Sequence, residues 1–424
     1  MIQLFLPCAA GVEDYLAAEA ARITGQDLAQ VQKWRGGVLL NAAWRDALLL
    51  NLHSRLAQRV LVQLFHAQYR NEQDLYLAAG EVAWEIWFTP RQSIKVEVTA
   101  QHSPLTSLNY AALKIKDAVC DRFRAKAGGV RPNVDTQWPD IRIYAHLTTD
   151  TVSLYIDTSG EALFKRGWRE DKGEAPLKET LAAAIIAASG WADDPRQPLY
   201  DPCCGSGTIA IEAAQIACNI APGALRRFAF EKMLPFQDHV WSAIKSAAVK
   251  ARTPLAQGHK PHIFGSDVAH RMVDFAQRNA QRAGVADAIE FRGGDALQRM
   301  PPGETPGVML VNPPYGERIE AAGVAGATSQ RHRGAARQVG LDGAAMAGRE
   351  QAQTEDGGEF FVQLASHWKK NYPGWTAWLL TPDLKLPGKM RLKESRRVPM
   401  WNGPIECRLF RFDMVKGSAR GGPV

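Results

Sequence analysis

Strand-like and helix-like segments alternate over the second half of the chain, and this alternation limits the fold more than any other feature. Short apolar runs are found at 199–200, 262–265, 289–292, 307–311 and 375–380. Segments with the apolar spacing of helices lie between or before them, at 177–189, 208–220, 269–283 and 359–370. Such alternation is typical of an α/β, parallel, doubly wound sheet, which binds ligands at the carboxyl ends of its strands.

The first 157 residues combine strands and helices in a different order. We expect strands at 2–7, 37–41, 59–66, 93–99, 141–148 and 151–157, and helices at 12–23, 44–52, 72–79 and 109–127. Thr149 and Asp150 separate the last two strands and predict a tight hairpin. This mixed order is typical of small α+β units.

The chain divides into more than one domain. A length of 424 residues predicts two or three domains, because a single hydrophobic core stops growing before that size. Residues 158–176 are rich in glycine and charge, so we expect a linker there, with Pro176 opening the next helix. Residues 321–358 contain few side chains to bury, and we expect a flexible insertion, either a lid over a site or a neutral loop.

Composition excludes several classes of protein. The longest nearly apolar run, 181–191, is shorter than the about 20 residues that cross a bilayer, so no membrane span is expected. Residues 1–11 lack the positive charge of a secretory leader and are interpreted as a buried strand. The six cysteines show no CxxC spacing, as a zinc site or redox pair would need. These observations predict a cytoplasmic, reduced protein without a metal.

Positive charge is concentrated near the end of the chain. The formal net charge of +7 suits a polyanionic partner. The densest basic cluster either contacts phosphates or is a solvated face, and it consists of Lys385, Lys389, Arg391, Lys393, Arg396 and Arg397. We add Lys165 and Arg166, in the expected linker, as candidate phosphate contacts.

A glycine-rich turn joins the strand at 199–200 to the next helix. Gly205 and Gly207 allow a sharp turn that approaches a ligand closely, where a Cβ would collide. The turn has neither Gly-x-Gly-x-x-Gly nor Gly-Lys-Ser/Thr, so the ligand is expected to lack a pyrophosphate. The expected pocket residues from this segment are Asp201, Cys203, Gly205, Ser206, Gly207 and Thr208.

Two further acidic residues follow the next two strands. Asp267 is placed to accept hydrogen bonds from both ribose hydroxyls of a nucleoside. Asp295 is placed to accept a bond from an adenine amine. Each of them alone would more often be a helix cap. Because three strands in succession end in a carboxylate, we favour a nucleoside pocket.

The strand at 307–311 is followed by Asn312, Pro313, Pro314, Tyr315 and Gly316. Two consecutive prolines fix φ and remove two N–H donors, so the turn offers carbonyl acceptors beside the amide oxygen of Asn312. Acceptors alone suit a planar amine with two hydrogens. Tyr315 offers a ring on which a base can stack. The motif predicts methylation of a planar amine, with acceleration coming mainly from alignment.

These residues resemble a known group, the class I methyltransferases that carry a THUMP domain and act on RNA, and more narrowly the bacterial large-subunit ribosomal RNA guanine-N2 methyltransferases. The resemblance extends over nearly the whole chain. The segments that carry it are 165–169, 175–185, 201–208, 211–214, 221–223 and 312–318.

The resemblance implies S-adenosylmethionine as cofactor and an RNA partner, ribosomal RNA or a large-subunit precursor. It implies a ferredoxin-like unit at 1–55, a THUMP domain at 56–157 and a methyltransferase domain at 177–416. The family's cofactor role falls on Asp201, Gly205, Gly207, Asp267 and Asp295, and its catalytic role on Asn312, Pro313 and Tyr315.

Other functions stay open at this point. Asn-Pro-Pro-Tyr is also found in enzymes that methylate adenine N6 in DNA or a glutamine amide in protein, but neither needs the α+β region at the start of the chain. A transfer RNA guanine-N2 methyltransferase is harder to exclude, because THUMP domains serve those enzymes too. A non-catalytic RNA-binding assembly factor would not need Asn312 and three acidic strand ends.

Overall fold

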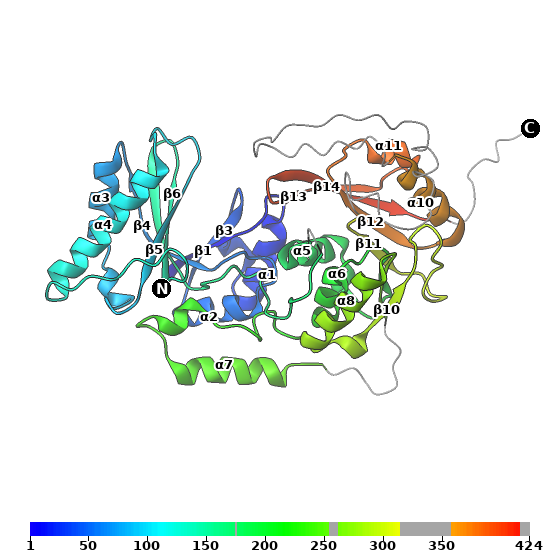
Figure 1. Cartoon of the computed structure of the whole chain (residues 1–424), viewed down its shortest axis with the longest axis horizontal. Helices are drawn as coiled ribbons and strands as arrows, with labels where there is room; N and C mark the ends of the chain where they lie inside the picture. Colours follow the sequence, from blue (N-terminus) through cyan, green and yellow to red (C-terminus); the bar gives the residue numbers. More distant parts are fainter. Residues whose placement is uncertain (174–175, 254–261, 314–357, 416–424) are drawn as a thin grey trace, which may run out of the picture. The chain divides into compact units, whose positions relative to one another are not determined.

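The computed structural model describes residues 1–173, 176–253, 262–313 and 358–415, which form two compact units (Figure 1). The N-terminal unit consists of Met1–Gly167 and Ala221–Ala251. The C-terminal unit consists of Trp168–Ile220 and the described residues from Arg252 onward. The chain therefore passes from one unit to the other at three places, after Gly167, after Ile220 and after Ala251.

The N-terminal unit contains one seven-stranded sheet with the order β2-β3-β1-β4-β7-β6-β5. Its strands are β1 (Ile2–Pro7), β2 (Gln32–Trp34), β3 (Gly37–Ala42), β4 (Leu61–Gln68), β5 (Ile94–Ala100), β6 (Ile141–Leu147) and β7 (Thr151–Asp157). The helices from Met1 to Gly167 are α1 (Glu13–Thr24), α2 (Trp44–His53), α3 (Glu72–Glu81) and α4 (Leu108–Lys126), with 3-10 turns η1 (Leu28–Gln30) and η2 (Trp84–Ile86). Strand β1 lies in the expected unit at 1–55 and β4 in the one at 56–157. Their antiparallel pairing joins the two units into one sheet. The predicted hairpin at Thr149 and Asp150 is confirmed by the β6–β7 pairing.

Alternating burial shows how this sheet is covered. On β6 every second side chain is buried, from Ile141 to Leu147. Helix α4 buries Ile115, Val119 and Phe123 in turn, and the Phe123 ring lies 4.9 Å from that of Phe88. Period-two burial on a strand and one apolar stripe on a helix are the patterns expected for a helix packed on one sheet face.

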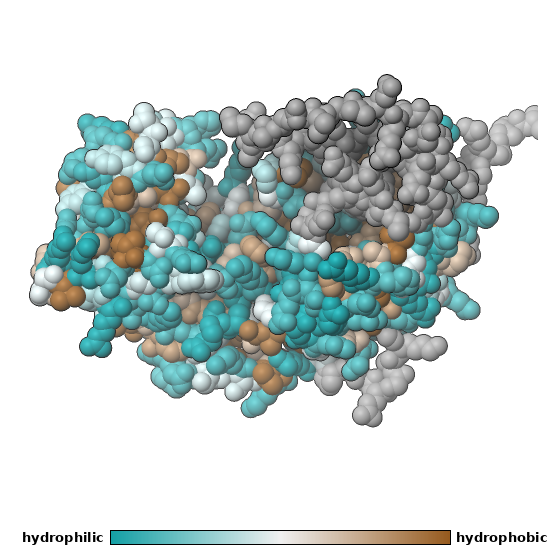
Figure 2. All heavy atoms as spheres, viewed as in Figure 1, coloured by the Kyte–Doolittle hydropathy of each residue, from teal (hydrophilic) through white to brown (hydrophobic). Residues whose placement is uncertain are grey.

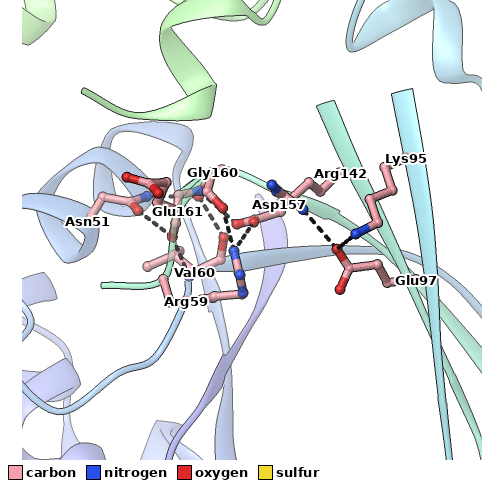
Figure 3. A network of polar contacts seen from close by, with 12 residues as sticks. Asn51, Arg59, Val60, Lys95, Glu97, Arg142, Asp157, Gly160 and Glu161 are labelled. Atoms are coloured by element: carbon pink, nitrogen blue, oxygen red, sulfur yellow. Dashed lines mark hydrogen bonds and ion pairs between the residues drawn. The ribbon is translucent and has the colours of Figure 1, made fainter. Parts of the chain in front are cut away.

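A polar network ties the start of β4 to the end of β7 (Figure 3). Asp157 is fully buried, and the Arg59 guanidinium donates to its carboxylate and to the Gly160 carbonyl, both at 2.5 Å. On the next strands Glu97 accepts from Arg142 at 2.8 Å. Because a buried carboxylate without a partner is costly, Arg59 is needed where the chain leaves the sheet.

Residues 221–251, which we call the excursion, leave the C-terminal unit and pack within the N-terminal unit. The excursion contains the 3-10 turn η4 (Ala229–Lys232) and α7 (Asp238–Lys250). Its backbone N–H groups at Gly223, Phe230 and Leu234 donate to the carbonyls of Leu52, Thr158 and Trp87. Thr253 N–H donates to the Cys218 carbonyl at 2.9 Å, so the excursion leaves and returns at the end of one helix.

Aromatic side chains pack the excursion internally, and the Arg226 side chain attaches it to the rest of the N-terminal unit. The Trp241 ring packs edge-on against Phe230 and Phe228, with centroids 5.0 and 5.7 Å apart, and all three are buried. The Arg226 guanidinium donates to four backbone carbonyls between Ser159 and Lys165. Burial lowers the pKa of Arg226 to about 10, which still leaves it charged at neutral pH.

The C-terminal unit contains a second seven-stranded sheet, with the order β10-β9-β8-β11-β12-β14-β13. Its strands are β8 (Leu199–Asp201), β9 (Ile263–Asp267), β10 (Ile289–Gly293), β11 (Val308–Val311), β12 (Thr376–Thr381), β13 (Arg396–Asn402) and β14 (Ile405–Asp413). The first five in spatial order are parallel, which confirms the expected α/β fold. The sheet is mixed and not wholly parallel, because β14 and β13 extend it as antiparallel strands that the sequence analysis did not predict.

Helices cover both faces of this sheet. Helices α5 (Glu179–Ser189), α6 (Thr208–Ala217) and α8 (His270–Arg282) pack on one face, with 3-10 turns η3 (Trp191–Asp193) and η5 (Ala286–Ala288). Helices α5 and α6 are almost wholly buried, whereas the exposed side of α8 is hydrophilic (Figure 2). On the other face α10 (Gly358–Asn371) and α11 (Leu386–Met390) enclose a core that includes Trp368, Leu379 and Phe410. Within the described residues, every helix is too short or too polar to span a bilayer.

Candidate functional site

Four polar residues named by the sequence meet at one edge of the second sheet. Strands β10, β9, β8 and β11 are parallel neighbours, so their carboxyl ends lie side by side. Asp201 ends β8, Asp267 ends β9, Asp295 follows β10, and Asn312 follows β11. This edge is where a doubly wound sheet holds its ligand.

The turn after β8 has the predicted sharp geometry. Gly205 and Gly207 have φ values of 52° and 86°, in the left-handed region that favours glycine. A Cβ on Gly207 would lie 2.9 Å from the Ala276 Cβ of α8, so this glycine is required by helix packing and not by a ligand. A Cβ on Gly205 would meet no protein atom within 4 Å. The open side of the turn, where a ligand can lie against the backbone, is therefore at Gly205.

Asp267 braces this turn with both of its carboxylate oxygens. Oδ2 accepts from Gly205 N–H and Oδ1 accepts from Ala269 N–H, both at 2.9 Å. The bond to Ala269 is a turn contact just before α8, whose N-cap is Ala269, so Asp267 does not cap this helix. A carboxylate offers about four acceptor positions, so two remain for ribose hydroxyls. The two backbone hydrogen bonds to Asp267 and the expected ribose contact are therefore compatible.

Asp201 is buried, with 2 % of its surface exposed. Its carboxylate accepts from Cys203 N–H at 3.1 Å. Burial raises the pKa of Asp201 to about 8, and the neighbouring carboxylate of Asp267 acts in the same direction. A positively charged ligand would stabilise the ionised form, so the site favours a cation beside the nucleoside pocket.

Asp295 and Asn312 complete the edge. The Asp295 side chain accepts from Leu297 N–H at 2.9 Å, a local cap of the kind considered from the sequence. Asn312 is partly exposed, whereas Pro313 is buried. The prolyl and aromatic residues that follow, Pro314 and Tyr315, lie outside the described residues, as do 321–357 of the expected insertion.

Two hydroxyls of the turn face inward. Ser206 and Thr208 are buried, and both accept hydrogen bonds from the Arg169 guanidinium, at 2.9 and 2.8 Å. Their side chains are therefore engaged with the protein, so that a ligand contact there would come from the backbone. Sequence reasoning missed Arg169, which lies in a segment interpreted as a linker. Glu179, which pairs with Arg169, was not predicted either, because an acidic residue is common in the first turn of a helix.

Among the residues that the structure describes, the cysteines are isolated thiols and not metal ligands. Cys204 is buried beside the turn, and burial raises the pKa of its thiol, which keeps it protonated. Cys203, its partly exposed neighbour, shows the same direction of pKa shift for the same reason. In the part of the chain that the structure describes, no three His, Cys, Asp or Glu side chains gather as metal ligands.

The basic cluster near the end of the chain is exposed. It is formed by Lys385, Lys389, Arg391, Lys393, Arg396 and Arg397. Helix α11, which contains Lys389, follows the carboxyl end of β12, and β12 is the parallel neighbour of β11. Part of the cluster therefore lies toward the same edge as Asn312.

Lys165 and Arg166, the two candidate phosphate contacts in the expected linker, differ in exposure. Lys165 is exposed and pairs with Glu161 at 2.6 Å. Arg166 is 2 % exposed, and its guanidinium donates to the Leu163 and Arg55 carbonyls. The prediction that Arg166 contacts phosphates is wrong for this conformation, because its charged end is enclosed by the protein.

A hollow of about 620 Å³ lies away from this edge. Its lining includes Thr376, the first residue of β12, and Asp413, the last residue of β14. These residues are at the opposite ends of the strands from Asp201 and Asn312. The hollow is therefore not part of the candidate site.

Three family models match the chain in sequence order. The RlmL ferredoxin-like domain matches residues 3–61, the THUMP domain matches 69–157, and the RMKL-like methyltransferase domain matches 166–339. The third match contains both the turn after β8 and the whole excursion. Residues assigned by sequence to the methyltransferase domain thus fold into the N-terminal unit.

Curated relatives match nearly the whole of this chain. "Ribosomal RNA large subunit methyltransferase K/L" of Psychromonas ingrahamii is 35% identical over 415 residues, 97% of this chain and 50% of the relative. The protein of the same name from Shewanella amazonensis is 35% identical over 422 residues, 99% of this chain and 54% of the relative. The chain spans about half the length of the curated relatives it matches.

Solved structures show the same fold over the whole chain. SMU.472, solved in complex with SAH, superposes with a TM-score of 0.79 at 26% identity and covers 98% of this chain and 99% of that protein. A predicted N6-adenine-specific DNA methylase from Listeria monocytogenes superposes with a TM-score of 0.78 at 27% identity. This match covers 97% of this chain and 96% of that protein. By these matches the chain contains RlmL ferredoxin-like, THUMP and RMKL-like methyltransferase domains in this order.

Proposed function

We propose that this protein transfers the methyl group of S-adenosylmethionine to the exocyclic N2 amine of a guanine in 23S ribosomal RNA. The observation that carries the proposal is the placement of Asn312 and Pro313 at the carboxyl end of β11, next to the Asp201 strand end. A methyl donor bound at the turn and an amine held at Asn312 would then be neighbours.

The cofactor fits the pocket in both shape and charge. The spare acceptor positions of Asp267 suit the ribose, and the open backbone at Gly205 suits close approach of the nucleoside. S-adenosylmethionine carries a sulfonium and an ammonium group, and the ionised form of Asp201 would be stabilised by such positive charge. SMU.472, the relative solved with SAH, shows that a similar fold holds the demethylated cofactor.

The proposed chemistry needs orientation more than proton abstraction. The Asn312 amide oxygen and the Pro313 carbonyl, both acceptors, would receive the two amine hydrogens and point the nitrogen lone pair at the methyl carbon. A nitrogen–carbon bond forms while the sulfur–carbon bond breaks, leaving a thioether. The methylated nitrogen carries a positive charge and then releases a proton to solvent. No strong base is required, because the amine becomes acidic on methylation.

RNA as the substrate rests on the N-terminal domains and on the relatives. A THUMP domain precedes the methyltransferase domain, and the curated relatives are named for the ribosomal RNA of the large subunit. We propose that the exposed basic cluster, with Lys165, contacts phosphates near the target base. We also propose the division into 1–55, 56–157 and 177–416, with 158–176 as a linker.

Mass mapping of RNA tests the substrate directly. RNA is isolated from a strain that lacks the protein and from the same strain after complementation. We expect one N2-methylguanine in 23S ribosomal RNA to disappear and to return. Loss of a methyl group from transfer RNA, or unchanged methylation of 23S ribosomal RNA, would contradict the proposed substrate.

The amine-holding role is tested by Asn312→Ala. We expect methyl transfer to fall by a factor of about 100 or more, because orientation of the amine is lost, whereas the affinity for SAH stays within a few-fold. Asn312→Asp is the matched variant, since it keeps an acceptor oxygen and replaces the amide NH2 with a second, charged oxygen. Normal turnover by Asn312→Ala would exclude the role.

A further inference from the structure

We propose that Arg169 is a positioning residue of the cofactor site, so that the segment just before the methyltransferase sheet shapes the turn that holds S-adenosylmethionine. This inference rests on the proposed function for the identity of the ligand. Its geometry lies wholly within the C-terminal unit, which begins at Trp168. Arg169 has no place in the glycine-rich motif.

The Arg169 guanidinium reaches the turn from its buried side. It donates from Nη1 to Ser206 Oγ at 2.9 Å and from Nη2 to Thr208 Oγ1 at 2.8 Å. Nη2 also donates to the Leu177 carbonyl at 3.2 Å. The two hydroxyls flank Gly207, a residue with positive φ, so one rigid planar group fixes both sides of the sharpest point in the turn.

A buried carboxylate orients the guanidinium. Arg169 Nε donates to Glu179 Oε1 at 2.7 Å, and the two side chains are 12% and 4% exposed. A planar fork with one edge held by Glu179 can present its other nitrogens in fixed directions, which an ammonium group cannot do. Arg169 therefore depends on the fork geometry of arginine as well as on its charge.

The neighbouring residues hold the segment against the turn. Asn279 of α8 donates from Nδ2 to the Asp171 carbonyl at 2.9 Å and to the Ser206 carbonyl at 3.1 Å. The Asp171 carboxylate in turn accepts from Arg278 and Arg282. Through these contacts the segment that begins at Trp168 belongs to the structure around the cofactor turn. Only Gly167 separates it from the buried Arg166 of the N-terminal unit.

The main test is the affinity for SAH of Arg169→Lys, measured by titration calorimetry with the full chain. Lysine keeps the charge beside Glu179 but cannot bridge both hydroxyls. We expect SAH to bind about tenfold more weakly, as the loss of one to two hydrogen bonds implies. Arg196→Gln is the control, since Arg196 pairs with Asp194 at an exposed site that takes no part in the contacts around the turn, and SAH affinity should stay within twofold.

Ser206→Ala with Thr208→Val removes the two acceptors and leaves the Arg169–Glu179 pair intact. We expect the same tenfold loss, and no further loss when Arg169→Lys is added, because all three changes break one set of contacts. In turnover, KM for S-adenosylmethionine should rise about tenfold while kcat stays within twofold, which a general loss of stability would not produce.

Two results would overturn the positioning role. One is an unchanged SAH affinity in the Ser206→Ala, Thr208→Val protein, which remains informative even if Arg169→Lys fails to fold. The other is additive losses, about a hundredfold when the changes are combined. A wild-type protein that binds SAH and methylates no RNA would instead contradict the proposed function and leave the role of Arg169 standing.

Discussion

Replacing Trp241 with alanine should unfold the N-terminal unit at a much lower temperature, although Trp241 belongs by sequence to the methyltransferase domain. The side chain is 3% exposed and packs edge-on against Phe228 and Phe230. Truncation of a buried tryptophan costs about 3 to 5 kcal/mol, including the edge-to-face contacts. For a unit of about 200 residues each kcal/mol lowers Tm by about 2 to 4 °C, so about 4 kcal/mol predicts a fall of roughly 8 to 16 °C.

Scanning calorimetry with and without SAH is the assay. A ligand stabilises the unit that binds it, so the transition that SAH shifts belongs to the C-terminal unit and the other to the N-terminal unit. Val249→Ala is the control, because Val249 lies on the same helix and is 56% exposed, and we expect a change below about 0.5 kcal/mol. A Trp241→Ala fall of less than about 3 °C, or a fall confined to the SAH-sensitive transition, would refute the assignment of the excursion to the N-terminal unit.

Three further predictions concern the cofactor site and the basic cluster. Asp267→Ala should weaken SAH binding about tenfold or more, since it removes the ribose acceptor and the brace on Gly205; unchanged affinity in calorimetry would refute the ribose assignment. Asp201 has a folded pKa of about 8, above its unfolded value, so the cofactor-free protein should lose stability as pH rises from about 4 to 8; denaturant titrations should show a flatter profile for Asp201→Asn. Lys385→Gln with Lys393→Gln should reduce the salt dependence of RNA affinity, lowering the slope of log Kd against log salt by about 1 to 2; an unchanged slope would place the phosphate contacts elsewhere.

Most of the fold could be predicted because its signals are local. The strand at Ile2–Pro7, the hairpin after Leu147 and the helix after Gly207 each follow from apolar spacing and turn residues in a short stretch of sequence. Strands β13 and β14 were not predicted, because their exposed arginines alternate with buried side chains and the basic residues drew attention to charge. The alternation of buried Val398 and Met400 with exposed neighbours was the signal available.

The site was predictable only in part, for a related reason. Asp201, Asp267 and Asn312 are recognisable because each lies at the end of a strand or directly after it, and strand order then brings them together. Arg169 reaches the turn from more than 30 positions earlier in the sequence, and no periodicity links such residues. The burial of Arg166 was equally invisible, because charge alone does not reveal whether a guanidinium faces solvent or backbone carbonyls.

The excursion also sets the order in which the protein can be completed during synthesis. The first 167 residues leave the ribosome without the segment that seals them, and roughly 80 more residues must be translated before Ala251 emerges. At about 5 to 20 residues per second this interval lasts roughly 4 to 16 s. Until then the carbonyls that receive the Arg226 guanidinium, and those of Leu52, Thr158 and Trp87 that receive backbone N–H groups of the excursion, lack these donors, so the N-terminal unit is complete only after Ala251 has emerged.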